Sequence, residues 1–483
     1  MGTSSDMDRF DIIIAGGGLT GMTMAHALAK TLGNYANIAL IDRNAFANAA
    51  SEGAPQAPSA GPAGAPAPNG SSAAPASPPS GPLTPVPPSG PLAPVPPSGP
   101  LAMALSADTK HMLEVLGVWA GLADNAQAVS EIEITDSSLD ATIRPGLLHY
   151  QNRINGDGPA SYIVENRHLQ GALRRAIASD RAITALGGRG IDHFAADENG
   201  VAVMLENGDT IKAALLITAD GRRSKLRQQA GIKTIDWDHE QIGIVTIVTH
   251  DKPHNGRAVQ HFLPAGPFAI LPLKADAAGR SRSCITWSEA ARRGRQIMAL
   301  DDDGFRNEVQ KRFGHKLGEV TLEAAQADAH AGVATAAQAS SPLRAAWPLT
   351  THLARGFIAR RFALVGDAAH GVHPIAGQGL NLAMRDVAAL SEVLKESSGL
   401  GLDLGGGDAL ERYERWRRFD SALSAAAFSG LNKLFSNDSM LLRTMRDAGL
   451  GMVDRLPGLK SFFVREAAGL TGEVPKLLKG EMI

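Results

Sequence analysis

The chain has 483 residues, of which 44% are hydrophobic, and this is enough apolar material to fill the cores of two or three domains. Its 47 lysines and arginines nearly balance its 49 aspartates and glutamates, and the net charge of −2 excludes a chain-wide attraction to nucleic acid or anionic lipid. The single cysteine, Cys284, excludes an intrachain disulfide and a multi-cysteine metal or iron-sulfur site, which fits a reducing cytoplasm, and favours a small core residue over a nucleophile.

The start of the chain, MGTSSDMDRF, is polar and acidic, whereas a signal peptide begins basic and continues apolar. No apolar run approaches the roughly 20 residues that a membrane-spanning helix needs. We therefore expect a cytoplasmic protein. Peripheral contact of this protein with the inner face of the membrane is compatible with that expectation and stays open.

A nucleotide-binding pattern follows directly. Residues 10–15 are an apolar, β-branched run typical of a buried strand, and GGGLTG then places Gly16, Gly18 and Gly21 in GxGxxG spacing. The first glycine permits the turn, the second lets the backbone approach a pyrophosphate, and the third lets a helix pack on the strand. The alternative is a tight turn that binds no ligand.

The segments after the glycines complete this pattern. Residues 22–32 have the apolar spacing of a helix, and residues 37–41 form a second strand that ends in Asp42. The helix N-terminus faces the phosphates with free N–H groups, and Asp42 is placed to accept hydrogen bonds from a ribose diol. Because the signature serves both NAD and FAD, it predicts a dinucleotide without naming it.

A proline-rich repeat interrupts the chain next. Seventeen of the 28 prolines fall between Pro55 and Pro100, where the nine-residue unit PPSGPLTPV is repeated almost three times. Such a composition cannot bury a core, so we expect residues 53–101 to be a disordered or extended insertion that enlarges a surface loop. Recognition of its PxxP pattern by a partner protein is the alternative.

Two further apolar runs each end in an acidic motif. Residues 214–219 are followed by the DG motif, Asp220 and Gly221, and residues 361–365 are followed by the GD motif, Gly366 and Asp367. In an open α/β sheet, ligands bind at the carboxyl ends of the strands, which is where Asp367 is expected. The glycines after Pro374 expose N–H groups at the start of a helix, which is a ready anion site. Three strand ends are therefore expected to converge on one extended cofactor.

Between these two motifs, four segments alternate or cluster like strands of an antiparallel sheet, namely 242–249, 258–263, 268–273 and 283–287. From about Asp408 the chain is expected to be helical, with arginines interleaved with leucine and phenylalanine. Solvated arginines over a packed helix are the favoured interpretation. A surface that rests on a membrane or on an assembly partner is the alternative.

The three motifs together, GGGLTG, ADGRRSKLR and LVGDAAHGVHPIAGQGLNLAMRD, resemble the FAD-dependent aromatic hydroxylases related to p-hydroxybenzoate hydroxylase. Within that group the chain is most similar to the ubiquinone-biosynthesis hydroxylases. The likeness covers nearly the whole chain except the proline-rich segment, and further pieces support it, namely ALS at 104–106, IVENRHLQGAL at 163–173, GPFAILPL at 266–273 and YERWRRFDSAL at 413–423.

The resemblance implies an α/β fold, with a Rossmann-like FAD-binding domain, an interleaved antiparallel-sheet substrate domain and C-terminal helices. One face of that sheet would cover the isoalloxazine ring. The expected boundaries are 6–52 for the first part of the FAD-binding domain, 53–101 for the proline-rich insertion, 102–230 for the second part with the start of the substrate sheet, 231–345 for the substrate domain, 346–407 for the third part and 408–483 for the C-terminal helices.

The resemblance also assigns roles to individual residues. The glycines of GGGLTG would hold the FAD pyrophosphate, Asp42 the adenosine ribose, and Asp367 the ribityl chain. The DG motif would support FAD and NAD(P)H, and the backbone from Gly377 to Asn381 would donate to the pyrimidine edge of the flavin. The catalytic positions are Pro374, Gly377 and Gln378, and the cofactor-binding positions are Gly16, Gly18, Gly21, Asp42, Arg43, Asp220, Gly221, Gly366, Asp367, Gly379, Leu380 and Asn381.

One position departs from the family pattern. The family carries an arginine three residues before Ala104, near the flavin phosphates or the nicotinamide donor, and this chain has Leu101 there. Reductant binding is therefore in question, and Arg43 or Arg167 is a candidate substitute. His370 and His373 are three residues apart but lack further ligands at metal-binding spacing, so we expect no metal and assign them to hydrogen bonding at the turn.

The implied function is a monooxygenase that hydroxylates the aromatic ring of a polyprenyl phenol in ubiquinone biosynthesis, using FAD, NADPH or NADH, and O₂ through a flavin hydroperoxide. Phe268, Ile270 and Leu271 would then line an apolar tunnel or pack in the core. The alternatives are a hydroxylase of a small soluble phenol, a flavin reductase of isoprenoid chains, and a non-catalytic FAD-binding assembly subunit. A plain NAD-dependent dehydrogenase is disfavoured because the motif GDAAHGVHPIAGQGLN does not belong to that class of enzyme.

Overall fold

The computed structural model describes residues 9–33, 36–44, 46, 101–136, 139, 146–154, 158–324, 344–372, 378–435 and 473–483. The expected proline-rich insertion at 53–101 lies outside the described residues except for Leu101. The C-terminal arginines from Arg443 to Arg455 also lie outside them.

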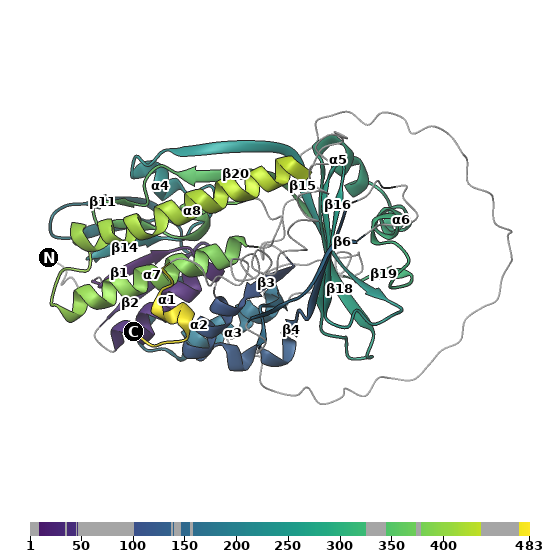
Figure 1. Ribbon diagram of the computed structural model, residues 1–483. Coiled ribbons are helices and arrows are strands. Elements are labelled where there is room, and N and C mark those ends of the chain that lie inside the picture. The colour runs from purple at the N-terminus through teal and green to yellow at the C-terminus, as the bar shows by residue number, and fades with distance from the viewer. Residues whose placement is uncertain are drawn as a thin grey trace, which may run out of the picture.

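A six-stranded sheet forms the left half of the molecule in Figure 1. Its strands lie in the order β10-β2-β1-β14-β22-β21, and all neighbouring pairs are parallel except β21 with β22. The strands are β1 (Ile12–Ala15), β2 (Ile38–Asp42), β10 (Ile183–Gly187), β14 (Leu215–Thr218), β21 (Ile358–Ala359) and β22 (Phe362–Leu364). The four strands predicted for this region are confirmed, with ends that differ by one or two residues.

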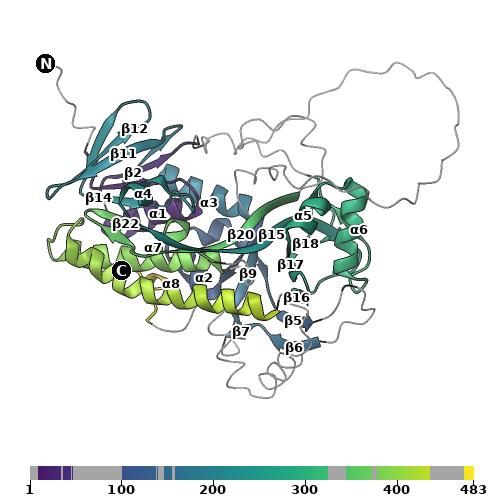
Figure 2. The ribbon, with the colours of Figure 1, turned by 90° about the horizontal axis from the view of Figure 1, so that it is seen from above.

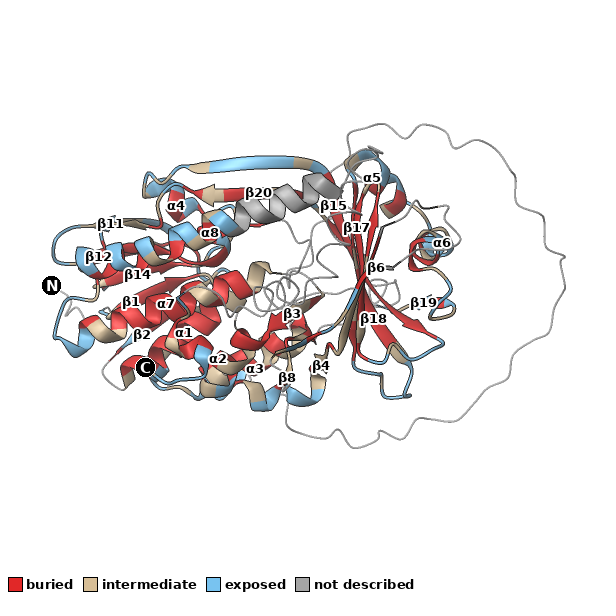
Figure 3. Ribbon diagram, viewed as in Figure 1, coloured by how far each residue is buried: buried red, intermediate tan, exposed pale blue. Residues whose placement is uncertain are grey.

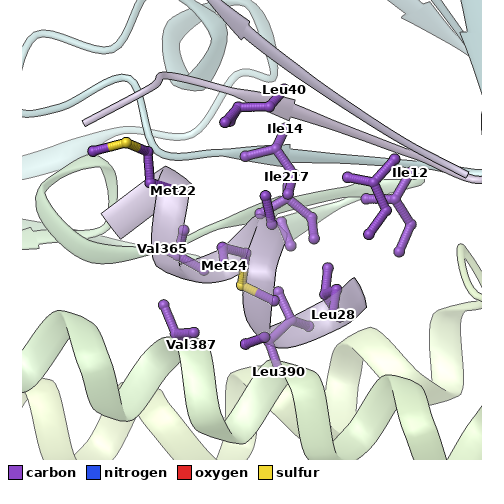
Figure 4. Close-up of a cluster of buried hydrophobic side chains, with 14 of the residues drawn as sticks. Ile12, Ile14, Met22, Met24, Leu28, Leu40, Ile217, Val365, Val387 and Leu390 are labelled. Carbon is purple, nitrogen blue, oxygen red and sulfur yellow. The ribbon is translucent and has the colours of Figure 1, made fainter. Parts of the chain in front are cut away.

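Helices pack on this sheet because each presents an apolar face to it. Figure 4 shows Met24 and Leu28 of α1 (Leu19–Leu32) and Leu390 of α7 (Gly379–Gly399) gathered below Ile12 and Ile14 of β1. These five side chains are completely buried. Burying such a side chain contributes about 1.5–3 kcal/mol, so this layer anchors α1 and α7 to the strand ends.

The remaining helices surround these layers. α7 lies beside α8 (Gly407–Phe435), the long yellow-green helix that extends toward the second sheet in Figures 1 and 2. The other helices are α2 (Ala107–Val115), α3 (Asn166–Ser179), α4 (Lys225–Gln229), α5 (Ala291–Met298) and α6 (Asp302–Phe313), with 3₁₀ turns η4 (Trp119–Gly121), η5 (Ala123–Asn125), η6 (Gly366–Ala368) and η8 (Lys476–Lys479). No helix in the described part of the chain is long and apolar enough to cross a membrane.

A nine-stranded sheet forms the other half, in the order β23-β20-β15-β18-β17-β16-β5-β6, with β19 paired to β15. Its strands are β5 (Glu131–Asp136), β6 (Gly146–Gln151), β15 (Thr234–His250), β16 (Arg257–Leu263), β17 (Gly266–Leu273), β18 (Ser281–Ala290), β19 (Val320–Leu322), β20 (Arg344–Ala354) and β23 (His370–Gly371). The four strands predicted here are confirmed. They pair antiparallel with one another, as expected, and β16 additionally pairs in parallel with β5. These two strands are far apart in sequence, so no hairpin forces them to be antiparallel.

The two faces of the large sheet have different partners. Phe268, Trp287 and Phe305 stack behind it, with centroids 5.6 and 6.0 Å apart, in a core that α5 and α6 cover at the right of Figure 1. Cys284 and Leu271 belong to the opposite face, where they pack with residues of β3 and β9. Figure 3 shows that the middle of the sheet is buried. Phe268 and Ile270 are therefore core residues on the side of α5 and α6, and of the three residues expected at the tunnel Leu271 alone lies on the face that packs with β3 and β9.

Small sheets complete the fold. They are formed by β3 (Ala102–Ser106), β9 (Ser161–Glu165) and β4 (Gln127–Ala128), by β11 (Ile191–Ala196), β12 (Val201–Leu205) and β13 (Thr210–Ala213), and by β7 (Arg153–Ile154) with β8 (Gly158–Pro159). The long strands β15 and β20 pair from Thr234–Ala354 to Thr246–Arg344 and connect the two halves. The expected fold class, a Rossmann-like half with an interleaved second sheet and a C-terminal helix, is confirmed, while the exact domain boundaries stay a prediction.

Candidate functional site

Gly16, Gly18 and Gly21 of GGGLTG occupy two different environments between β1 and α1. A Cβ atom on Gly16 would lie 2.4 Å from the carbonyl oxygen of Ala219, and one on Gly21 would lie 1.8 Å from the carbonyl oxygen of Gly16. A Cβ atom on Gly18 would meet nothing within 4 Å. Gly18 is exposed and is the N-cap of α1, with no side chain capping the helix. The first and third glycines are thus required by packing, and the second leaves an open cradle that fits a pyrophosphate.

Asp42 lies beside this cradle at the end of β2. One carboxylate oxygen accepts from the backbone N–H of Gly17 at 2.6 Å and the other from that of Asn44 at 2.7 Å. A carboxylate has about four lone-pair sites, so capacity for a ribose hydroxyl remains. Arg43 forms an ion pair with Glu206 at 2.7 Å on the surface. The ribose role of Asp42 and a phosphate role of Arg43 both stay predictions.

The second and third motifs meet next to the first. β14 pairs with β1 on one side and with β22 on the other, so the ends of these three strands are neighbours. Arg227, just after the DG motif, donates to the carbonyl oxygen of Ala368 at 2.7 Å, and Arg222 lies 3.9 Å from Asp367. Asp220 is exposed, and Gly221 has a φ of 84°. The structure therefore brings the three strand ends together, as the sequence predicts.

The turn after β22 exposes one acidic side chain and is held through its backbone. Gly366 has a φ of 59°, a conformation that favours glycine, and a Cβ atom there would lie 2.9 Å from Thr20. The side chain of Asp367 is 52% exposed. Its carbonyl oxygen accepts from Nε2 of His352 at 2.8 Å. Burial, together with the positive charge of Arg222, lowers the pKa of His352 to about 4, so this histidine is a neutral donor at pH 7.

The start of α7 is fastened to β3. The Asn381 side chain accepts from the backbone N–H of Ser106 and from the hydroxyl of Thr109, both at 3.0 Å, and donates to the carbonyl oxygen of Ala104 at 3.0 Å. The side chain of Gln378, the N-cap of α7, forms no capping hydrogen bond, and the first N–H groups of a helix have no partner within the helix itself. Gly379 and Leu380 are partly exposed at the same place. Pro374, Gly377 and His373 lie outside the described residues.

Two residues of this site were missed in the sequence. Asp386 is completely buried on α7 and accepts from the backbone N–H of Gly366 at 2.9 Å and from Nε2 of His370 at 2.6 Å. His352, described above, comes from β20. Asp386 occupies the apolar face of a predicted helix, and a charged residue at such a position was a signal that could have found it. Nothing in the local sequence of His352 distinguishes it.

The environment of Leu101 is apolar. Its side chain packs against a cluster of buried apolar residues that includes Ala102, Ile163 and Cys284, and its carbonyl oxygen accepts from the backbone N–H of Asn166 at 2.9 Å. Arg167, the next residue, forms an ion pair with Glu165 at 3.0 Å. Arg167 is thus next in sequence to the residue that hydrogen-bonds Leu101, whereas Arg43 pairs with Glu206 on the surface, and the role of either arginine as a substitute stays a prediction.

Comparison with known proteins places these motifs in a family. The profile of the FAD binding domain family matches residues 98–419. Ubiquinone hydroxylase UbiL from Rhodospirillum rubrum is 37% identical over 380 residues, covering 78% of this chain and 82% of that protein. The 3-demethoxyubiquinol 3-hydroxylase of Escherichia coli is 33% identical over 310 residues, covering 64% and 73%. Human ubiquinone biosynthesis monooxygenase COQ6 is 27% identical over 383 residues, covering 74% and 79%.

Solved structures agree on the fold. The p-nitrophenol 4-monooxygenase PnpA from Pseudomonas putida superposes with a TM-score of 0.67 at 16% identity, covering 97% of this chain and 100% of that one. PqsL from Pseudomonas aeruginosa superposes with a TM-score of 0.64 at 18% identity, covering 92% and 99%. At identities this low, the structural likeness shows the fold alone. The assignment to a family rests on the sequence relatives. The chain belongs to the FAD-dependent hydroxylases of ubiquinone biosynthesis and is a flavoprotein monooxygenase.

Proposed function

We propose that this enzyme hydroxylates the aromatic ring of a polyprenyl phenol in ubiquinone biosynthesis, with NAD(P)H and O₂ as co-substrates. The observation that carries the proposal is the meeting of three strand ends with the uncapped starts of α1 and α7, in a chain related to ubiquinone hydroxylases. Two helix N-termini directed at one extended site suit a ligand with negative charge at two places. FAD has such charge on its pyrophosphate and, when reduced, on its flavin ring.

Each part of the site has a role in this proposal. The N–H groups around Gly18 would bind the pyrophosphate, and Asp42 would bind the adenosine ribose. Asp367 would bind the ribityl chain, with Asp220 and Gly221 beside it. The first N–H groups of α7, at Gln378, Gly379, Leu380 and Asn381, would stabilise negative charge at the pyrimidine edge. Pro374 and Gly377, outside the described residues, would lie next to the ring system, as the sequence predicts. FAD would supply the oxygen transfer, which no protein side chain can perform.

The protein's contribution to the reaction is binding and exclusion of water. We place the phenol between the start of α7 and the face of the large sheet that carries Leu271. That face is apolar where it packs with β3, through residues such as Ala258 and Cys284. An apolar wall suits a prenyl chain and keeps water away from the reacting atoms. Burial raises the pKa of the Cys284 thiol to about 12, so this residue is an inert core residue behind the wall and no nucleophile.

The experiment that tests the function is a quinone profile of cells that lack the protein, measured by mass spectrometry of extracted lipids. The expected result is accumulation of a prenylated phenol that lacks one hydroxyl, together with FAD absorbance in the purified protein and substrate-stimulated oxidation of NAD(P)H. Unchanged ubiquinone with FAD bound would contradict the proposal. In that case, NAD(P)H oxidation stimulated by small phenols would indicate a soluble substrate, and no stimulation would indicate an assembly subunit.

We also propose that α8 brings the enzyme to the membrane in which such a substrate is dissolved. Phe419 is 75% exposed and Leu423, one turn later, is 59% exposed. Arg415 and Arg418 are exposed on the same helix. Apolar side chains flanked by arginines suit the surface of an anionic lipid bilayer, where the rings and chains insert and the arginines contact phosphates.

Sedimentation with phosphatidylglycerol-containing vesicles tests this surface. The double variant Phe419→Glu, Leu423→Glu should lose binding, and the double variant Leu400→Glu, Leu402→Glu is the matched control, since it alters two exposed leucines beyond α7. Binding should fall with salt and should be weak on neutral phosphatidylcholine vesicles. Equal binding by both double variants would refute the membrane contact without affecting the proposed reaction.

A further inference from the structure

A cluster of buried charged side chains connects α8 with the turn that carries Asp367. Arg417 of α8 is only 2% exposed, and Asp386 of α7 is fully buried. Nε of Arg417 donates to Oδ1 of Asp386 at 2.9 Å, and Nη1 donates to Oδ2 of Asp420 at 2.6 Å. Asp420 also accepts from Arg385 at 3.2 Å. Arg385 also lies 3.7 Å from Asp108, so the two arginines are shared among three aspartates. Asp108 and Asp386 are fully buried, where an unpaired charge would be very costly.

The other oxygen of Asp386 is directed at the flavin-binding turn. Oδ2 accepts from the backbone N–H of Gly366 at 2.9 Å and from Nε2 of His370 at 2.6 Å. Burial alone would raise the pKa of Asp386, but His370 and Arg417 outweigh it and hold the pKa below its ordinary value. An ionised carboxylate accepts only, so Nε2 of His370 carries a hydrogen. One carboxylate therefore holds both ends of the turn from Gly366 to His370.

α8 makes a second contact with the same strand end. The hydroxyl of Tyr413, one turn before Arg417, donates to the carbonyl oxygen of Leu364 at 2.7 Å. From the opposite side, His352 donates to the carbonyl oxygen of Asp367. The backbone of the turn is thus held by α7, α8 and β20, while the side chain of Asp367 is half exposed. Arg417 therefore reaches the turn through the Asp386 carboxylate, to which it donates at 2.9 Å.

We propose that Arg417 is a positioning residue for FAD: by orienting Asp386, it sets the backbone of the turn from which Asp367 reaches the cofactor. The planar guanidinium fixes two carboxylates in defined directions, which a flexible or apolar side chain cannot do. Without it, Asp386 would be a buried carboxylate lacking its arginine partner. Protonation of the Asp386 carboxylate, or movement of its side chain toward water, would relieve the cost of this buried charge. Both changes would weaken the hydrogen bonds from Gly366 and His370 to Asp386. This inference rests on FAD occupying the site and not on the identity of the phenol.

The first experiment measures FAD affinity of Arg417→Met by titrating the apoprotein and following flavin fluorescence. Loss of charge-assisted hydrogen bonds at the turn is expected to raise the FAD dissociation constant about tenfold or more and to change the shape of the visible flavin bands. Arg412→Met is the matched control, because Arg412 also joins α8 to α7 through Glu396 but is 49% exposed and lies away from the turn. The control should bind FAD like the parent protein. Equal affinities for the two variants would overturn the proposal.

A second measurement separates positioning from general stability. Sucrose stabilises folded proteins without replacing a specific contact, so it should raise the melting temperature of Arg417→Met and leave the FAD affinity low. Guanidinium at millimolar concentration should restore FAD affinity to Arg417→Ala, whereas sodium at the same ionic strength should not. Recovery of FAD affinity in sucrose alone would show that Arg417 acts only through stability and would overturn the proposal.

Two conservative variants keep the test decisive if Arg417→Met does not fold. Arg417→Lys keeps the charge without the fork, and Asp386→Asn keeps the shape without the charge. Both are expected to weaken FAD binding and to alter the flavin spectrum. Parent-like affinity and spectrum in both variants would overturn the positioning role, while failure of the quinone experiment above would leave this result untouched.

Discussion

Gly18→Ala and Gly21→Ala should have opposite effects, because the structure assigns the two glycines different purposes. A Cβ atom on Gly21 would lie 1.8 Å from the carbonyl oxygen of Gly16, and real Cβ contacts stay above 3.0 Å. The first turn of α1 would therefore have to move by 3.0 − 1.8 = 1.2 Å. Because Met24 and Leu28 hold α1 against β1, such overpacking is expected to destabilise the apoprotein by about 3 kcal/mol.

Gly18→Ala should leave the fold unchanged. The backbone of Gly18 has a φ of −71° and a ψ of −177°, which alanine adopts readily, and its Cβ would meet nothing within 4 Å. The free energy of unfolding of the apoprotein should change by less than about 0.5 kcal/mol. The added methyl group would instead occupy the cradle proposed for the pyrophosphate. The FAD dissociation constant should rise about tenfold, which corresponds to about 1.4 kcal/mol.

The assay combines urea unfolding of the two apoproteins, followed by circular dichroism, with titration of FAD followed by flavin fluorescence. Each variant serves as the control for the other. The reasoning would be refuted if Gly18→Ala bound FAD as tightly as the parent, since the cradle would then not hold the pyrophosphate. It would also be refuted if Gly21→Ala unfolded at the parent's urea concentration.

Further predictions concern groups away from this cradle. Arg282 is buried between Glu165, at 2.8 Å, and Glu323, at 2.7 Å, so Arg282→Met should destabilise the protein by about 3–5 kcal/mol in urea unfolding, and a loss under 1 kcal/mol would contradict a buried triad. The pKa of His352 is about 4 in the folded protein and 6.5 in the unfolded chain, so the unfolded chain binds the extra proton and stability falls as the pH drops from 6.5 to 4. In His352→Gln, the free energy of unfolding should fall less between pH 6.5 and 4, by up to about 3 kcal/mol, than it does in the parent protein. An equal fall in variant and parent, measured by urea unfolding at the two pH values, would argue against a buried neutral histidine. Cys284 is completely buried, so iodoacetamide should modify it only in urea, and modification of the native protein would show that the sheet opens.

Local patterns in the sequence were sufficient to predict the main helices and strands and their order along the chain. The strand, glycine turn and helix at 10–32 are local features, since apolar spacing and chain-reversing glycines act within a few residues. The convergence of strand ends also followed from sequence, because parallel strands in one open sheet end at the same edge. The motifs were specific enough to indicate the family, which the relatives confirm.

Local sequence patterns could not predict which face of the large sheet each side chain occupies. Alternation along β17 shows that Phe268 and Leu271 face opposite sides, but it does not show which side meets α5 and α6. Tertiary packing places Phe268 in the core behind the sheet. The parallel pairing of β16 with β5 likewise depends on a contact between segments more than a hundred residues apart.

The sequence by itself determined the elements, their order and the family, because these depend on spacing within short segments and on motifs that few other proteins share. Only the tertiary structure decided which charges are buried and paired. Asp386, Arg417 and Asp420 belong to two helices, and their carboxylates and guanidinium meet only when α7 and α8 pack. The cost of an unpaired buried charge then selects one arrangement of these helices, and with it the position of the turn that carries Asp367.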